Sequence, residues 1–315
     1  MSGAERRMLS FPDPVLAGLE IPVVTATGDG DGPHLCLLAG VHGCEYSSID
    51  AVRRFMRDLD PGRLAGTITA VAIANPSTFW GRTPFVSPAD GLNINRCFPG
   101  DADGSFSQVL AHRLFERLIR PADALLDLHG GDLVEALEPF TLFDASPVES
   151  RARELAVAFG LPWVARVERS SSPVAGTTSA AAAEHGIPGV IAEVGGCGLL
   201  EESAVRWHLS GIRNVLCALG MLEGEPEPPA GPQHMVDRFL WIRCREAGWW
   251  RPAVRAGDRF AAGDELGAVE DLFGEPAERV HAPEDGLVLF VTSSPAVAAD
   301  GLLLGLGAGL APIPA

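Results

Sequence analysis

An imidazole and a carboxylate stand three residues apart in the stretch AGVHGCE, at His42 and Glu45. The apolar run HLCLLAG (34–40) precedes this pair and a helical pattern follows it, so both side chains can converge from one turn. Such a pair suits Zn²⁺, which catalytic sites bind through three protein ligands while a fourth position stays open. The HxxE spacing alone is a weak signal, because it recurs by chance.

A third ligand must then come from another part of the chain. The stretch DLHGGD offers His129, at the end of the apolar run ALLDLH (124–129). The alternative is a buried core histidine whose ring is held by Asp127 or Asp132. The residues around His129 do not decide between these two roles.

Two more stretches carry polar side chains that could take part in binding or catalysis. GLNINRCFPG (91–100) places Asn95 and Arg96 in a turn-rich loop, where a guanidinium either grips a carboxylate through two hydrogen bonds or lies on the surface. IPGVIAEVGG (187–196) ends an apolar strand in Glu193. A carboxylate there must face a cleft, be paired or bind metal, because burying it alone is costly. A base that takes a proton from metal-activated water meets these constraints.

The elements that position these groups form an alternating pattern. Continuous apolar runs predict buried strands at 34–40, 68–74, 124–129 and 189–194. Apolar residues at three- and four-residue intervals predict helices at 44–60, 106–119, 149–159 and 202–220. This alternation predicts an α/β fold with a mixed or parallel sheet flanked by helices. Its active residues are expected at the carboxyl ends of the strands.

The composition changes at EGEPEPPAGPQ (223–233), a Pro-rich acidic stretch that reads as a linker. We therefore predict a catalytic domain over residues 1–222 and a β-rich accessory domain over residues 234–315. VRAGDRFAAGDELGAV and VHAPEDGLVL resemble the half-repeats of a lipoyl-type barrel-sandwich. This segment contains no lysine that could accept a prosthetic group, so it is not expected to act as a swinging carrier.

Charge and cysteine usage bound the class of protein. The net charge of −17 argues against nucleic acid and anionic membrane surfaces as partners. No apolar stretch is long enough to span a bilayer. The six cysteines are scattered without pairs or a framework spacing, which predicts reduced thiols and a cytoplasmic location.

Taken in order, AGVHGCE, NINRCFPG, DLHGGD and IPGVIAEVGG resemble the succinylglutamate desuccinylase/aspartoacylase family of the zinc-carboxypeptidase-like superfamily. The resemblance covers about residues 20–222 and extends to the β module. It implies a zinc-carboxypeptidase-like fold with one Zn²⁺ per chain. By position, the resemblance implies these roles: metal ligands His42, Glu45 and His129, general base Glu193, and substrate-carboxylate clamp Asn95 and Arg96.

The sequence departs from the family pattern at one position, and one stretch is similar to a particular branch of the family. Family members usually carry an arginine that polarises the scissile carbonyl, and Phe85 stands at the matching position here. Either Arg82 fills that role from a shifted loop, or zinc does more of the polarising. The stretch VAGTTSAAAAEHGIPGVIAEVGG is most similar to the N-acetyl-diaminobutyrate deacetylase branch, which would place Thr177 and Thr178 near the substrate. A helix N-cap explains these threonines equally well.

The implied activity is a zinc-dependent amidohydrolase that removes a small acyl group, of acetyl or succinyl type, from an N-acyl amino acid. A carboxypeptidase-type metallopeptidase is the nearest alternative, and a non-catalytic metal-binding relative is a further one. The expected partner is the small substrate alone. Members of the family often self-associate, so a homo-oligomer is left open.

Overall fold

The computed structural model describes residues 2–168 and 175–314. The first part of the chain alternates strands with helices. The strands are β1 (Gly3–Ser10), β2 (Glu20–Thr27), β3 (Gly30–Ala39), β4 (Ala65–Val71), β5 (Ala124–Gly131), β6 (Glu135–Leu137), β7 (Phe140–Asp144), β8 (Trp163–Val167) and β9 (Gly189–Gly196). The helices are α1 (Tyr46–Asp58), α2 (Pro76–Gly81), α3 (Phe106–Leu114), α4 (Glu149–Phe159), α5 (Thr178–Glu184) and α6 (Glu202–Ala218).

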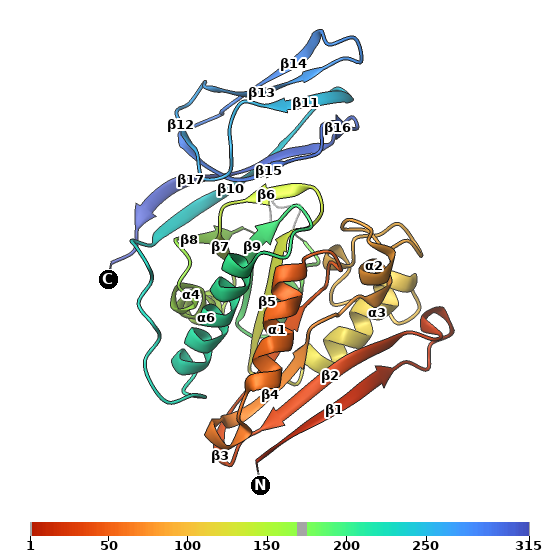
Figure 1. The fold of residues 1–315 in the computed structure, drawn as a ribbon, viewed down its shortest axis with the longest axis vertical. Helices are drawn as coiled ribbons and strands as arrows, with labels where there is room; N and C mark the ends of the chain where they lie inside the picture. The colour runs from red at the N-terminus through yellow and green to blue at the C-terminus, as the bar shows by residue number, and fades with distance from the viewer. Residues whose placement is uncertain (1, 169–174, 315) are drawn as a thin grey trace.

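The predicted strands form the centre of a mixed sheet with the order β1-β2-β4-β3-β5-β9-β7-β8 (Figure 1). Strands β4, β3, β5 and β9 are parallel neighbours, whereas β1, β2 and β7 run antiparallel to a neighbour. The prediction of a mixed α/β sheet is confirmed. The parallel order brings the carboxyl ends of β3, β5 and β9 to one edge.

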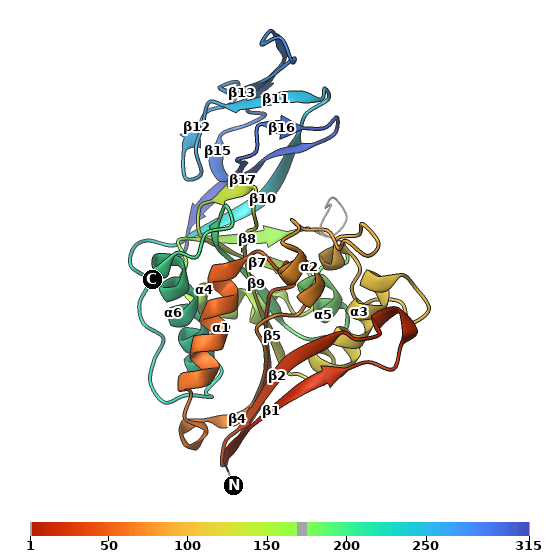
Figure 2. The same ribbon diagram turned by 45° about the vertical axis from the view of Figure 1, so that its right-hand side comes forward.

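Helices cover both faces of this sheet, as the alternation of apolar side chains along β3 requires. Leu35 and Leu37 join the core beneath α1, α4 and α6, whereas Cys36 and Leu38 join the core beneath α3 and α5. Figure 2 shows the two helical layers on opposite sides of the sheet. A central strand buried on both faces explains why the run HLCLLAG contains almost no polar residue.

The predicted elements agree with the structure to within a few residues, with one internal difference. The helix predicted over 106–119 ends as an α-helix at Leu114, and Phe115–Ile119 form a π-helical turn. The sequence patterns did not predict β1, β2, β6, β7, β8, α2 or α5. None of the described helices is both long and apolar enough to span a membrane.

Beyond α6 the described residues form strands and connecting segments only. The strands are β10 (His234–Arg243), β11 (Gly248–Pro252), β12 (Arg259–Phe260), β13 (Glu265–Glu270), β14 (Pro276–His281), β15 (Gly286–Thr292), β16 (Ala296–Val297) and β17 (Leu302–Pro312). Residues 223–233 contain no helix or strand. The barrel-sandwich form and the domain boundaries remain predictions.

The C-terminal strands are joined to the sheet of β1–β9 by backbone hydrogen bonds. β10 pairs in parallel with β8, with His234 opposite Trp163, and the sheet continues through β17, β15 and β12. β6 also pairs with β15, so a second ribbon connects the two parts. Strands β14, β13, β11 and β16 form a separate sheet at the top of Figure 1. The C-terminal region therefore extends this sheet from its β8 edge.

Candidate active site

The turn after β3 brings His42 and Glu45 together. Gly40 adopts a φ of +66°, and a Cβ on this residue would lie 2.7 Å from the carbonyl oxygen of Ala72. A Cβ on Gly43 would lie 2.0 Å from the backbone nitrogen of Phe79. These glycines let the chain turn tightly before α1, and His42 Nδ1 comes to 2.8 Å from Glu45 Oε1.

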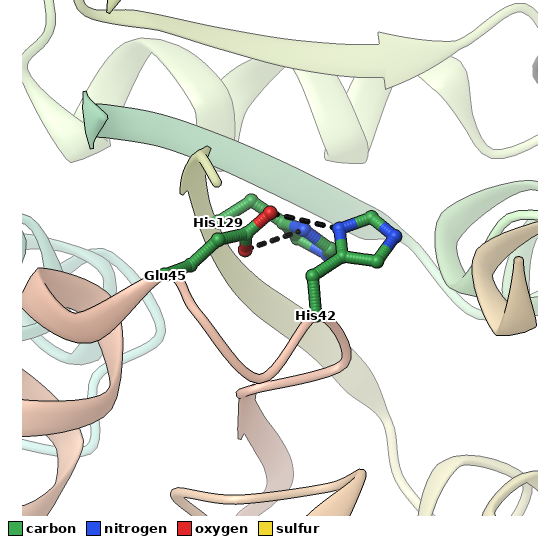
Figure 3. Close-up of side chains that lie close together, drawn as sticks. All are labelled: His42, Glu45 and His129. Atoms are coloured by element: carbon green, nitrogen blue, oxygen red, sulfur yellow. Dashed lines mark hydrogen bonds and ion pairs between the residues drawn. The ribbon is translucent and has the colours of Figure 1, made fainter. Parts of the chain in front are cut away.

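His129 reaches the same point from the end of the neighbouring strand. β5 lies parallel to β3, with Ala39 opposite Leu128, so His129 extends just beyond the end of β3. Its Nδ1 lies 3.0 Å from Glu45 Oε2, and Glu45 stands between the two imidazoles (Figure 3). One ligand atom from each of His42, Glu45 and His129 lies within 4.8 Å of the other two. All three side chains are buried.

The outer nitrogen of each imidazole is held by a further acceptor. His129 Nε2 lies 2.9 Å from Asp127 Oδ2, and His42 Nε2 lies 3.0 Å from Asn93 Oδ1. These contacts fix both rings with Nδ1 toward Glu45, which is how metal-binding histidines are commonly oriented. The contact between Asp127 and His129 is the one that the core-histidine alternative predicted. The same contact also orients His129 Nδ1 toward Glu45.

The donor set of this cluster fits a zinc ion. Glu45 Oε2 is buried and has only the 3.0 Å ion-pair contact with His129 Nδ1, without a well-aligned hydrogen bond from the described residues. An unsatisfied buried carboxylate oxygen is costly, and a cation between the three side chains would satisfy it. Two imidazole nitrogens and one carboxylate oxygen are ligands that Zn²⁺ accepts in catalytic sites.

The electrostatics of the cluster favour a charged carboxylate. Burial alone would raise the pKa of Glu45, but His129 and His42 outweigh burial and lower it to about 2. Burial would lower the pKa of His129, and the carboxylates Asp127 and Glu45 reverse this effect and raise it well above the ordinary value. Without a cation, His129 therefore keeps a proton that a metal must displace.

Glu193 lies on β9, directly beside His129 in the parallel pairing of β5 with β9. Its carboxylate and that of Glu135 line the same cavity, and neither forms a hydrogen bond or an ion pair with another described side chain. Burial raises the pKa of Glu193 to about 8, with a further contribution from the Glu45 charge that His129 partly offsets. A carboxylate with such a pKa is suited to accept and return a proton.

Asn95 and Arg96 lie on the short helix Ile94–Arg96 at the side of the cluster. Asn95 is buried, its Oδ1 accepts a hydrogen bond from the backbone nitrogen of Thr178, and its Nδ2 lies 3.5 Å from His129 Nε2. Arg96 is exposed toward the cavity, where its guanidinium donates to the carbonyl oxygen of Asn95 at 2.7 Å. The structure thus brings both residues to the rim of the cluster.

The two threonines have different surroundings. Thr177 is the N-cap of α5, where its hydroxyl accepts a hydrogen bond from the backbone nitrogen of Ala180, and it also lines the cavity. Thr178 is fully buried, and its hydroxyl donates to Asp127 Oδ2 at 2.5 Å. Thr178 therefore supports the carboxylate that orients His129.

Arg82 and Phe85 occupy opposite sides of one loop. Arg82 is exposed at the end of α2 and is not among the described residues that line the cavity. Phe85 lines the cavity, with its ring edge-on to His42 at 5.5 Å between centroids. Its φ of +55° and a hydrogen bond from its backbone nitrogen to Asp132 hold it there. An aromatic ring, and not a guanidinium, thus lies beside the first ligand.

The cavity around these groups has a volume of about 370 Å³. The C-terminal strands contribute part of its wall, through Phe239, Trp241 and Arg243 of β10 and through Phe290 and Thr292 of β15. The sequence reading did not identify this contribution. The sequence pattern that could have indicated it is the two-residue spacing of Phe239, Trp241 and Arg243, which places three side chains on one face of a strand.

The chain is similar to known proteins along most of its length. A family model described as the succinylglutamate desuccinylase/aspartoacylase catalytic domain matches residues 31–219. The chain is 30% identical over 298 residues to the N-alpha-acetyl-L-2,4-diaminobutyric acid deacetylase of Halomonas elongata, covering 91% of this chain and 86% of that protein.

Solved structures show the same fold. A succinylglutamate desuccinylase/aspartoacylase from Rhodobacter sphaeroides superposes with a TM-score of 0.82 at 27% identity, covering 99% of this chain and 96% of the other. The product-bound ectoine utilization protein EutE (DoeB) from Ruegeria pomeroyi superposes with a TM-score of 0.83 at 25% identity, covering 98% and 94%. The chain belongs to the succinylglutamate desuccinylase/aspartoacylase family.

Proposed function

We propose that this protein is a zinc-dependent amidohydrolase that removes a small acyl group from an N-acyl amino acid. The observation that carries the proposal is the placement of Glu193 beside His129, in a cavity where two imidazoles turn Nδ1 toward one carboxylate. The deacetylase of Halomonas elongata, which shares 30% of its residues with this chain, supports an N-acyl amino acid as the substrate.

His42, Glu45 and His129 would hold the ion. When bound there, Zn²⁺ would supply Lewis-acid activation and lower the pKa of a water molecule beside it to about 7. Asp127 and Asn93 keep the two rings in the tautomer that presents Nδ1. A cation between these ligands would also lower the pKa of Glu193, because a nearby positive charge favours the carboxylate.

The remaining steps belong to side chains of the cavity. Glu193 accepts a proton from the attacking water and delivers it to the amine nitrogen as the C–N bond breaks. The hydroxyl of the water stays on the carbonyl carbon, so the products are a carboxylic acid and an amino acid. Arg96 and Asn95 would hold the substrate carboxylate and fix the amide relative to Glu193, which lowers the entropic part of the barrier. Phe85 offers no charge for the developing oxyanion.

The dimensions of the cavity favour an acyl amino acid over a peptide. About 370 Å³ is near the lower end of the roughly 300–1,000 Å³ that small-molecule pockets span, and the C-terminal strands form one wall of it. A carboxypeptidase would also need room for the peptide chain that precedes the residue it removes.

The test is hydrolysis by the zinc-loaded protein of N-acetyl, N-succinyl and N-formyl amino acids beside a panel of short peptides. We expect release of free amino acid from the first group only, and cleavage of peptides alone would refute the proposal. The Glu193→Gln variant should retain zinc and lose about 10²–10⁴-fold in kcat, the range typical of general acid–base groups. Unchanged turnover in this variant would exclude Glu193 as the base.

A further inference from the structure

The cavity extends beyond the catalytic groups into a space whose walls are apolar. We call this space the apolar chamber and define it by Phe140, Leu142, Ile191, Phe239, Trp241 and Phe290. These residues come from β7 and β9 of the catalytic sheet on one side and from β10 and β15 on the other. None of them is charged, whereas the rest of the cavity holds the metal ligands and the carboxylates.

Strand pairing places the apolar chamber directly beside Glu193. In the antiparallel pairing of β7 with β9, Phe140 lies opposite Glu193 and Leu142 lies opposite Ile191. Directly paired residues project from the same face of a sheet, so all four side chains point to the same space. An amide held at Glu193 would therefore have one substituent aimed at the chamber.

The aromatic rings of β10 and β15 form the opposite wall as a connected group, and Phe140 of the first wall contacts this group. The centroids of Phe239 and Trp241 are 4.8 Å apart, those of Trp241 and Phe290 are 5.7 Å apart, and those of Phe140 and Phe239 are 5.9 Å apart. Phe140 and Phe290 are buried, whereas Phe239 and Trp241 keep part of their surface accessible. A ligand that covers this surface gains hydrophobic stabilisation in proportion to the area buried.

Two charged side chains lie beside these rings along the strands: Arg243 follows Trp241 on the same face of β10, and Glu135 lies on β6. Glu135 pairs with Thr292 on the ribbon formed by β6 and β15, and Leu137 pairs with Phe290 two residues farther on. A substrate ammonium could approach Glu135, but inside the apolar chamber it would find aromatic faces and no described carboxylate. Burial of an unpaired cation there is costly, so the chamber favours an uncharged group.

We propose that the apolar chamber binds a branched or aromatic group of the substrate, so that the preferred substrates are N-acyl amino acids with a bulky apolar acyl group or side chain. This inference rests on the proposed amidohydrolase function. It differs from a preference for small polar substrates, which would leave the aromatic wall exposed to water.

Four substrates separate the sources of the apolar group. N-acetyl-L-phenylalanine carries it in the side chain, N-(3-phenylpropionyl)glycine carries it in the acyl group, N-acetylglycine lacks it, and N-α-acetyl-2,4-diaminobutyrate carries an ammonium instead. We expect kcat/KM for one of the aromatic substrates to exceed that for N-acetylglycine by at least about tenfold, since pocket contacts of this kind give about 10–200-fold discrimination. Equal values, or a preference for the diaminobutyrate compound, would overturn the inference.

A binding measurement keeps this test separate from that of the proposed function. L-phenylalanine, glycine, 3-phenylpropionate and propionate are titrated calorimetrically into the zinc-loaded protein. Either aromatic compound should bind at least about tenfold more tightly than its small counterpart. If all four substrates resist hydrolysis, the proposed function is wrong, and the calorimetric result alone then decides whether the apolar chamber takes an apolar group.

Substitutions in the C-terminal strands provide the structural control. Trp241→Ala should lower kcat/KM for the preferred aromatic substrate by at least about tenfold more than it lowers kcat/KM for N-acetylglycine. Trp249→Ala is the matched control, because Trp249 lies on β11 with 46% of its surface exposed and does not line the cavity. Equal losses on both substrates in Trp241→Ala would contradict the inference.

A second variant, which adds a larger side chain to the cavity, tests the inference even if the Trp241→Ala protein does not fold. Leu137 is partly exposed and lines the cavity opposite Phe290. Leu137→Trp should occupy the apolar chamber, so that activity on the aromatic substrate falls by at least about tenfold while N-acetylglycine is still cleaved. Undiminished activity on the aromatic substrate would place its apolar group elsewhere.

Discussion

Asp127 is the side chain whose loss most directly tests how the ligand cluster is held. It is fully buried, and its Oδ2 accepts hydrogen bonds from His129 Nε2 at 2.9 Å and from the hydroxyl of Thr178 at 2.5 Å. Loss of such an outer partner typically costs about 10–100-fold in metal affinity, equivalent to about 1.4–2.7 kcal/mol. Asp127→Asn retains an acceptor oxygen and removes the charge, so we expect about a tenfold loss. Asp127→Ala removes both and should approach a loss of about 100-fold.

Zinc affinity is measured by competition with a chromogenic chelator, and thermal unfolding of the metal-free variants checks that they fold. Thr178→Val is the matched control, because it removes one hydrogen bond to Asp127 and leaves the contact with His129. We expect its zinc affinity to stay within a few-fold of the original protein. Wild-type affinity in both Asp127 variants, or a loss in Thr178→Val as large as in Asp127→Ala, would refute the orienting role.

Three further predictions follow from the site and its surroundings. Arg96→Ala should raise KM for carboxylated substrates by at least about tenfold and leave KM for their amides nearly unchanged. Arg82→Ala tests the arginine considered for polarising the carbonyl, and it should leave kcat and KM nearly unchanged for both kinds of substrate, since Arg82 is exposed outside the cavity. Zinc affinity should rise by up to about tenfold per pH unit as long as His129 carries its extra proton, because the metal binds only the neutral ring. Competition with a chelator at several pH values measures this dependence. An affinity that does not change with pH would contradict it. His208 is fully buried, and burial lowers its pKa to about 4 from an ordinary 6.5. Between these two values the unfolded chain binds a proton that the folded chain does not. The free energy of unfolding therefore falls by about 3 kcal/mol as the pH falls through this interval. Denaturant unfolding of the metal-free protein at several pH values should show a weaker acid dependence in His208→Gln, and an identical dependence in both proteins would exclude His208 as a cause.

The central part of the fold and the grouping of His42, Glu45 and His129 could be predicted because their signals are local. Unbroken apolar runs mark the strands that helices cover on both faces, and the parallel order of such strands gathers their carboxyl ends. His42, Glu45, His129 and Glu193 each follow or end such a run. Sequence spacing therefore sufficed to nominate them, and the topology then determined that they meet.

The substrate side of the site could not be predicted in the same way, because it depends on irregular backbone and on distant pairing. Arg82 and Phe85 both adopt left-handed backbone conformations, with φ of +52° and +55°, and no spacing rule shows which of them faces the cavity. Phe239 and Trp241 follow a visible two-residue alternation. That they line the cavity depends on the pairing of β10 with β8, between segments about 70 residues apart.

The pairing of β10 with β8 also limits how the C-terminal strands can move and whether they can be removed by truncation. Because the C-terminal strands share a hydrogen-bonded ladder with the catalytic sheet, they cannot open like a hinged cover without breaking main-chain bonds. Removing them would uncover one edge of β8, where unpaired backbone groups invite association with other chains. Substrate selection and folding are thus tied to the same strands, so changes that alter one will tend to affect the other.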